Sequence, residues 1–266
     1  MRLVLSVALC LVSPLPSLAQ VRTFEVASVL PSAPGQNGSF CRFDLPAAAQ
    51  CGNMPLRDII SIAYDLGLAS GLNDDAMFRL MGGADALLSR PFDIKATAAA
   101  TATIVEKKEM LRSLLRDRFM LRLRPEVRQV PLFAVTRDRK ELGPALKPST
   151  VDCASEEMRA RRAANQPTPC GVLRSELVGG VRFIRNVGSM QVFARSVQAQ
   201  LGRPVIDETG LTGTFEWSAR YRAENSDIDA PLFVDAVRQE LGLRIVPKTG
   251  PYEVMVIDSV APPTGN

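Results

Sequence analysis

Residues 189–221 read SMQVFARSVQAQLGRPVIDETGLTGTFEWSARY, and this stretch decides the fold that we expect for the chain. Ser189 can cap a helix whose apolar side chains recur at helical spacing as far as position 201. Gly202 follows where helices often end in a left-handed glycine. A strand at 204–206, a turn, and a strand at 213–221 come next. The stretch therefore predicts a helix followed by two strands.

The same order of elements occurs twice more along the chain. We expect helices starting at 106 and at 232, each followed by two strands, namely 119–123 with 130–136, and 243–246 with 252–257 around a turn at 248–251. Because one such unit cannot bury its helix and sheet faces alone, the units should pack together. The sequence therefore predicts an α+β fold of repeated helix-strand-strand units. These units form small mixed or antiparallel sheets, with helices packed on one face, in two lobes.

The first part of the chain predicts further elements. An alternating apolar and polar pattern indicates a half-buried strand at 23–30, and a second strand is expected at 92–96. Between them, Asn53 can cap a helix that has Pro55 in its first turn and Gly67 at its end.

The N-terminus predicts a cleaved signal peptide at 1–19. Arg2 precedes a short apolar run, and Ala19 closes a segment with small residues at the positions that a signal peptidase reads. The alternative is a lipoprotein anchored through Cys10, but Leu9 is large where such a site needs a small residue. We therefore expect a periplasmic or secreted protein with no membrane span.

Three further segments are expected after the signal peptide. They are an N-terminal α+β lobe at 20–147, a disulfide-closed polar linker with a short helix at 148–180, and a C-terminal lobe of helix-strand-strand units at 181–266.

The remaining four cysteines predict disulfide bonds, because an exported protein meets an oxidising compartment. They cluster as two local pairs, Cys41 with Cys51 and Cys153 with Cys170, and each bond would fix an irregular loop. A zinc site is the alternative. The spacings do not fit one, and no histidine completes a mixed site. We expect no metal and no cofactor.

The composition argues against most catalytic classes. The chain has no histidine, which removes Ser-His and Cys-His nucleophilic systems, and it carries no P-loop, nucleophile elbow or dinucleotide fingerprint. Carboxylate pairs remain, namely Asp74–Asp75, Glu156–Glu157 and Asp227 with Asp229. Asn225, Asp227 and Asp229 also resemble the start of a calcium loop, whose later ligand positions are missing. We expect these acids to be solvated and assign no catalytic residue.

Two features are candidates for recognition. Arg112 and Arg116 continue a basic helical stripe from Lys108, which either binds an anionic partner or is a solvated helix face. Trp217, the only tryptophan, either packs in the core or stacks on a ligand. The net charge of +4 is too small and too dispersed to predict nucleic-acid binding.

Three stretches carry a family resemblance: RPVIDETGLTGTF at 203–215, the ending LGL with GPYEVMVID at 241–258, and FEVASV at 24–29. The chain resembles the soil-associated bacterial protein family of unknown function. The resemblance implies an exported domain with no established reaction. Some relatives are joined to membrane sensor-peptidase modules, which implies extracytoplasmic sensing or binding; this chain shows no such part. The helix-strand-strand units are also similar to periplasmic domains of secretins and TonB-dependent receptors, an analogy of fold only.

Three hypotheses about function follow. The first is an exported, non-catalytic module of the bacterial envelope that binds an envelope protein or a small extracytoplasmic ligand, with edge strands open to a partner strand. The second is a hydrolase of polysaccharide or cell wall that uses paired carboxylates. The third is a structural component of envelope assembly.

Overall fold

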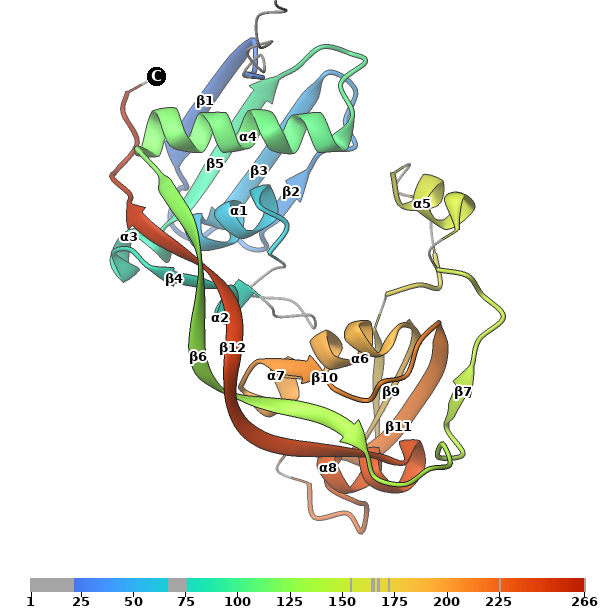
Figure 1. Cartoon of the computed structure of the whole chain (residues 1–266). Coiled ribbons are helices and arrows are strands. Elements are labelled where there is room, and N and C mark those ends of the chain that lie inside the picture. Colours follow the sequence, from blue (N-terminus) through green and yellow to red (C-terminus); the bar gives the residue numbers. More distant parts are fainter. Residues whose placement is uncertain are drawn as a thin grey trace, which may run out of the picture.

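The computed structural model describes residues 22–66, 76–153, 155–163, 166, 168–171, 173–224 and 226–265 of the 266-residue chain. Within these ranges the strands form three sheets of four strands each, and helices pack against them (Figure 1). The expected α+β class is therefore confirmed. We number the three sheets in the order in which the chain enters them.

The first sheet is antiparallel throughout and has the strand order β1-β5-β3-β2. Its strands are β1 (Val26–Pro31), β2 (Phe40–Arg42), β3 (Ala48–Pro55) and β5 (Pro91–Thr97). The strands expected at 23–30 and 92–96 correspond to β1 and β5.

Helices cover one side of the first sheet (Figure 1). These are α1 (Leu56–Ala63) and the long α4 (Ile104–Phe119), with the short α3 (Asp85–Leu88) nearby. The first turn of α4 is fixed by a capping box in which Thr103 and Glu106 each bond the backbone of the other. The Thr103 backbone N–H is the main cause that lowers the pKa of Glu106 to about 2. On the inner side, Phe119 packs edge-to-face on Phe92 at 5.1 Å between ring centroids.

The predicted cap of α1 is wrong. Asn53 lies within β3 in a left-handed conformation, with φ of 48°, and its side-chain amide donates to the carbonyls of Gln36 and Gly38. Pro55 takes the position before α1, without a side-chain cap. The amide of Asn53 is thus used to hold the preceding loop. The expected end of this helix, Gly67, lies outside the described residues.

The second sheet is built on a long antiparallel ribbon of β6 (Arg122–Arg137) and β12 (Leu243–Ser259), which links the upper and lower parts of the molecule in Figure 1. β4 (Leu80–Gly82), which follows α2 (Ala76–Arg79), pairs parallel with one end of β12. β10 (Val205–Asp207) pairs parallel with β6 toward the other end. The sheet order is β10-β6-β12-β4.

The structure corrects all three predicted strand pairs. The strands expected at 204–206 and 213–221 lie in different sheets, because the first is β10 and the second, at 215–222, belongs to the third sheet. The ribbon replaces the other two pairs. The turn expected at 248–251 does not form, because Gly250 and Pro251 stay in β12 opposite Val130 and Gln129 of β6. The break expected between 123 and 130 is likewise absent, and Phe119 belongs to α4. Local turn signals are overridden here because each strand finds a continuous partner in the other.

The third sheet has the order β7-β11-β9-β8, with antiparallel neighbours. Its strands are β7 (Leu146–Pro148), β8 (Arg174–Val178), β9 (Val181–Gly188) and β11 (Phe215–Arg222). The helices beside it are α6 (Met190–Ser196), α7 (Gln198–Leu201), α8 (Phe233–Ala236) and the π-helix η1 (Val237–Leu241). Ser189 caps α6, and Gly202 and Gly242 end α7 and η1 in the left-handed conformation, as expected.

The described residues form two hydrophobic cores. The first lies between the first sheet and helices α1 and α4, and the second lies between the third sheet and helices α6, α8 and η1. The ribbon contributes to both, since Ile257 of β12 belongs to the first core and Ile245 of the same strand to the second. The C-terminal strand therefore returns to the first core. The segment boundaries at 147 and 180 stay predictions.

Both cysteine pairs lie at disulfide distance. Cys41 and Cys51 are direct partners on β2 and β3, with sulfurs 1.94 Å apart, so this bond joins two strands and does not close an irregular loop as expected. Cys153 and Cys170, with sulfurs 2.03 Å apart, enclose the short helix α5 (Glu156–Ala163) that was expected inside the linker.

Candidate functional site

The third sheet has one covered face and one open face. Along β11, the buried residues Phe215, Trp217, Ala219 and Tyr221 alternate with Glu216, Ser218, Arg220 and Arg222, which are exposed. Phe193 of α6 packs on Trp217 at 4.9 Å, and Phe233 of α8 packs on Tyr221 at the same distance, so the helices cover the first set. The second set belongs to the side that we call the open face.

The open face is hollowed by two overlapping cavities of about 600 and about 660 Å³. Both are bordered by the same five residues: Pro144, Ala145, Arg174, Arg185 and Ser218. Volumes of this size fall in the range of ligand pockets. The shared border makes one continuous hollow across strands β8, β9 and β11.

The strand register places two arginines side by side at the centre of this hollow. Arg174 of β8 lies directly opposite Arg185 of β9, and Arg185 lies directly opposite Ser218 of β11. Like charges directly opposite one another destabilise a sheet. A negatively charged group bound between the two guanidinium groups would remove that repulsion.

These cations are only weakly neutralised by the protein. The nearest carboxylate oxygen of Glu176 lies 4.0 Å from a guanidinium nitrogen of Arg185, at the limit of an ion pair. Among the residues that the structure describes, Arg174 and Lys147 of β7 make no ion pair or side-chain hydrogen bond. Both residues border the larger cavity.

The other two acids near the hollow already have partners. Glu240 accepts a hydrogen bond from the backbone N–H of Arg220 at 3.1 Å, and its second oxygen lies 3.5 Å from the Arg220 Nε. Glu216 accepts a hydrogen bond from the Ser149 hydroxyl at 2.9 Å. Both acids thus have partners, whereas the side chains of Arg174 and Lys147 have none among the described residues, with Lys147 directly opposite Glu216 in the sheet. Guanidinium groups suit carboxylates or phosphates.

Two of the three predicted binding residues, Arg112 and Arg116, lie elsewhere. Arg112 connects α4 to the end of α1: its Nε donates to the Ala63 carbonyl, a terminal nitrogen lies 3.1 Å from the Asp65 carboxylate, and its guanidinium stacks 5.2 Å from the Tyr64 ring centroid. Lys108 also contacts Asp65. These contacts hold two helices together.

Arg116 and Trp217 are placed differently from each other. Arg116 is exposed on α4 and forms an ion pair with its sequence neighbour Asp117 at 3.4 Å. Trp217 is only 2% exposed and packs on Phe193, which agrees with the core alternative; it also borders the larger cavity from within the sheet. The structure does not bring Arg112 or Arg116 to the open face.

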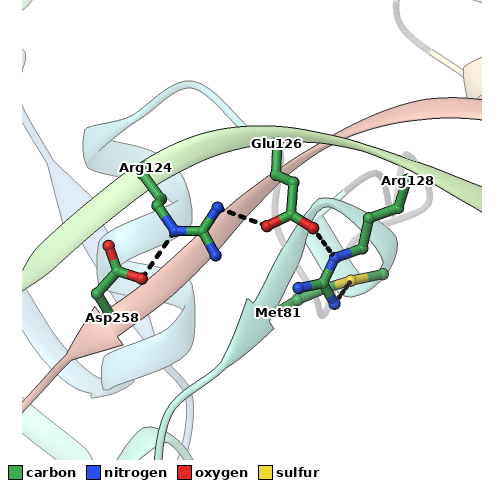
Figure 2. A network of polar contacts seen from close by, with 5 residues as sticks. All are labelled: Met81, Arg124, Glu126, Arg128 and Asp258. Atoms are coloured by element: carbon green, nitrogen blue, oxygen red, sulfur yellow. Dashed lines mark hydrogen bonds and ion pairs between the residues drawn. The ribbon is translucent and has the colours of Figure 1, made fainter.

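Two basic residues that follow α4, Arg124 and Arg128, form a polar network in the ribbon. Figure 2 shows Arg124 between the carboxylates of Glu126 and Asp258, with its Nε donating to Asp258 at 2.9 Å. Arg128 donates to the other oxygen of Glu126 at 2.6 Å and, through a terminal nitrogen, to the Met81 sulfur. The hydrogen bonds from Arg128 and then Arg124 lower the pKa of Glu126. This network ties β4, β6 and β12 together.

The predicted carboxylate pairs form no common site. Glu156 and Glu157 are exposed in the first turn of α5, where Glu157 pairs with Arg161 at 3.0 Å. Asp227 and Asp229 are exposed in a loop, and Asp227 borders a separate cavity beside β8. Asp74, Asp75 and Asn225 lie outside the described residues. In the part of the chain that is described, no group of three His, Cys, Asp or Glu side chains is placed to hold a metal ion.

A protein-family model matches residues 57–260, which include the ribbon and the whole third sheet. Its description is "Protein of unknown function (DUF3738)". The chain belongs to this family. The DUF3738 match confirms the expected family of unknown function, and it leaves the soil association and the fused modules as predictions. The chain matches no curated protein and no solved structure. No described helix has the length and apolar character needed to cross a membrane.

Arg174 and Arg185 were not predicted as a site, because a linker was expected at 148–180 and no strand was expected at 181–188. The expected linker contains β8, which forms a hairpin with β9 across Gly179–Gly180. A Gly-Gly pair between two short alternating runs is a known hairpin signal, and it would have placed the two arginines opposite one another. Part of the candidate site of this DUF3738 chain, the pairing of β8 with β9, could therefore have been predicted from the sequence.

Proposed function

We propose that this protein is an exported, non-catalytic binding module that holds an acidic peptide segment of another envelope protein on the open face of its third sheet. The observation that carries the proposal is the juxtaposition of Arg174 and Arg185 in a hollow whose neighbouring acids Glu216 and Glu240 already have partners. Two adjacent guanidinium groups bind carboxylates strongly when each can form paired hydrogen bonds.

Two further features support a peptide ligand, and a third supports export. The hollow is open and runs across three strands, which suits an extended chain better than a compact molecule. Apolar surface borders the charges, because Phe183 is 39% exposed beside Arg185 and Pro144 and Ala145 line the other side. Export is supported by the two cysteine pairs at disulfide distance, since such bonds persist in oxidising compartments.

The binding test uses a fluorescein-labelled oligo-glutamate peptide and the disulfide-intact protein. We expect saturable binding by fluorescence anisotropy, weaker at higher salt because exposed charges are screened. Arg185→Gln should weaken binding by roughly tenfold, in line with the loss of one charge-assisted contact. Lys95→Gln, on the open side of the first sheet, is the matched control and should leave binding unchanged.

Two results would contradict the proposal. The first is an Arg185→Gln variant that binds the peptide as well as the wild type. The second is equal weakening by Lys95→Gln, which would indicate nonspecific attraction to positive charge.

The partner can be identified in cells with a photo-reactive amino acid at Ser218, in the floor of the hollow. We expect one dominant crosslinked protein in the envelope fraction, joined through an acidic segment that mass spectrometry maps. The same amino acid at Lys95 should not capture that protein. A crosslink to an apolar segment would overturn the acidic-peptide assignment.

A further inference from the structure

The strand β8 forms an unprotected edge of the third sheet. It pairs on one side with β9, and no described strand pairs with its other side. Two large apolar side chains stand on this five-residue edge, since Leu177 is 57% and Val178 is 61% exposed. Exposed edges with apolar side chains are sites where another strand adds.

The tight turn after β8 fixes which backbone groups face outward. Gly179 and Gly180 both have positive φ, 54° and 82°, as a two-residue type I′ hairpin turn requires. In such a hairpin the flanking residues, here Val178 and Val181, form a hydrogen-bonded pair, and such pairs alternate along the strands. The backbone groups of Arg174, Glu176 and Val178 therefore face β9. Those of Ser175 and Leu177 face away from the sheet.

We propose that two copies of this chain pair through β8, antiparallel to one another, with Ser175 opposite Ser175 of the partner subunit. The outward N–H and C=O groups of Ser175 then bond the same groups of Ser175 of the partner subunit across a two-fold axis. An antiparallel ladder requires that the residues of such a hydrogen-bonded pair both face outward from their own sheets. The same register sets Arg174 opposite Glu176 of the partner subunit, and this contact occurs twice by symmetry.

The charges select this register over its neighbour. If one strand shifts by two residues, outward backbone groups still lie opposite one another. Glu176 then lies opposite Glu176 of the partner subunit, a like-charge contact that destabilises a sheet. Directly opposite side chains in an antiparallel pair lie on the same face. The Arg174 and Glu176 contacts therefore form on the open face, and the two third sheets become one sheet of eight strands.

Pairing would also change the hollow. Glu176 now lies 4.0 Å from Arg185, and the partner's Arg174 would compete for that carboxylate. Arg185 would then lose its nearest described acid. The dimer rests on Arg174 and Glu176, whereas peptide binding is tested through Arg185, so failure of one does not imply failure of the other.

The test is analytical ultracentrifugation of the disulfide-intact full chain over a concentration series. We expect a reversible dimer for the wild type, and association weakened by roughly tenfold or more for Arg174→Glu and for Glu176→Arg, each of which creates two like-charge contacts. The double variant Arg174→Glu with Glu176→Arg restores opposite charges at both contacts. It should associate within a few-fold of the wild type.

A second variant tests the backbone contact. Ser175→Pro removes an outward N–H at the symmetry centre while leaving the ladder with β9 intact, since proline is tolerated on edge strands in that position. It should be monomeric, with the near-UV circular dichroism of the wild type as the folding control. A wild type that stays monomeric at every concentration overturns the proposal. So does a double variant as weak as either single variant, which would favour an unrelated strand as the occupant of this edge.

Discussion

The open sides of the first and third sheets differ in how their charged groups are used. On the first sheet, one oxygen of Asp93 accepts hydrogen bonds from the Ser32 hydroxyl at 2.7 Å and from the Asn53 backbone N–H at 2.8 Å. On the third sheet, Arg174 and Arg185 stand opposite one another with little neutralisation. We infer that the charged group on the open side of the first sheet stabilises the fold, whereas those on the open face of the third sheet are available to a partner.

The covered sides of the same sheets are alike, because each centres on an edge-to-face aromatic pair. We therefore expect the largest effects there. Phe119→Ala and Phe193→Ala should each lower the free energy of unfolding by about 3–5 kcal/mol, since each removes a fully buried ring. Denaturant unfolding followed by Trp217 fluorescence and by far-UV circular dichroism measures both changes.

The same experiment tests whether the cores unfold separately. Trp217 lies in the second core, so Phe193→Ala should shift the fluorescence transition more than Phe119→Ala does. If both variants shift it equally, the two cores behave as one cooperative unit through the shared ribbon.

A smaller effect is expected for Asp93→Asn on the first sheet. The Asn53 backbone N–H, followed by the Ser32 hydroxyl, lowers the pKa of Asp93 in the folded protein. The ionised form therefore stabilises the fold above the unfolded pKa, and this contribution is lost as the pH falls through the folded pKa. After solvent screening we expect at most about 1 kcal/mol at neutral pH.

Unfolding curves at neutral and at acidic pH measure this contribution. The difference between Asp93→Asn and the wild type should disappear at low pH, where both side chains are neutral. A difference that persists unchanged in acid would mean that the amide disturbs the loop for a reason other than charge.

The smallest effect on stability is expected at the open face of the third sheet. Arg185→Gln removes one member of a like-charge pair, so the free energy of unfolding should change by less than about 0.5 kcal/mol or rise slightly. The same variant weakens peptide binding under the proposed function. A loss of stability well above 1 kcal/mol would show that Arg185 serves the fold, as Asp93 does, and would remove the contrast between the two surfaces.

The parts of the fold that follow from local chemistry were predictable. Ser189, Gly202 and Gly242 act at helix ends through their own backbone preferences, and the structure places them as expected. Gly250 and Pro251 were misread as a turn because their conformation depends on pairing with β6, a strand more than 100 positions earlier. The helix cap predicted at Asn53 was wrong for a similar reason, since its side-chain amide donates hydrogen bonds to a loop that precedes it by about fifteen residues.

The candidate site was less predictable than the fold. Arg112 and Arg116 were predicted as binding residues because they form a basic stripe on one helix. The contacts of Arg112 with Asp65 and Ala63 depend on helix packing that the sequence does not show. Arg174 and Arg185 are isolated in the sequence and become neighbours only through strand register. Sites formed by residues of several strands are generally difficult to predict from the order of residues along the chain.

The lower end of the ribbon also determines how the protein can be divided. Arg137 at the end of β6 lies directly opposite Leu243 at the start of β12. The chain leaves the ribbon after Arg137 and returns to it at Leu243, and of the strands between them only β10 pairs with the ribbon. A short turn joining Arg137 to Leu243 would excise the third sheet together with β10 and keep β6 paired with β12, and another module could be grafted at the same junction.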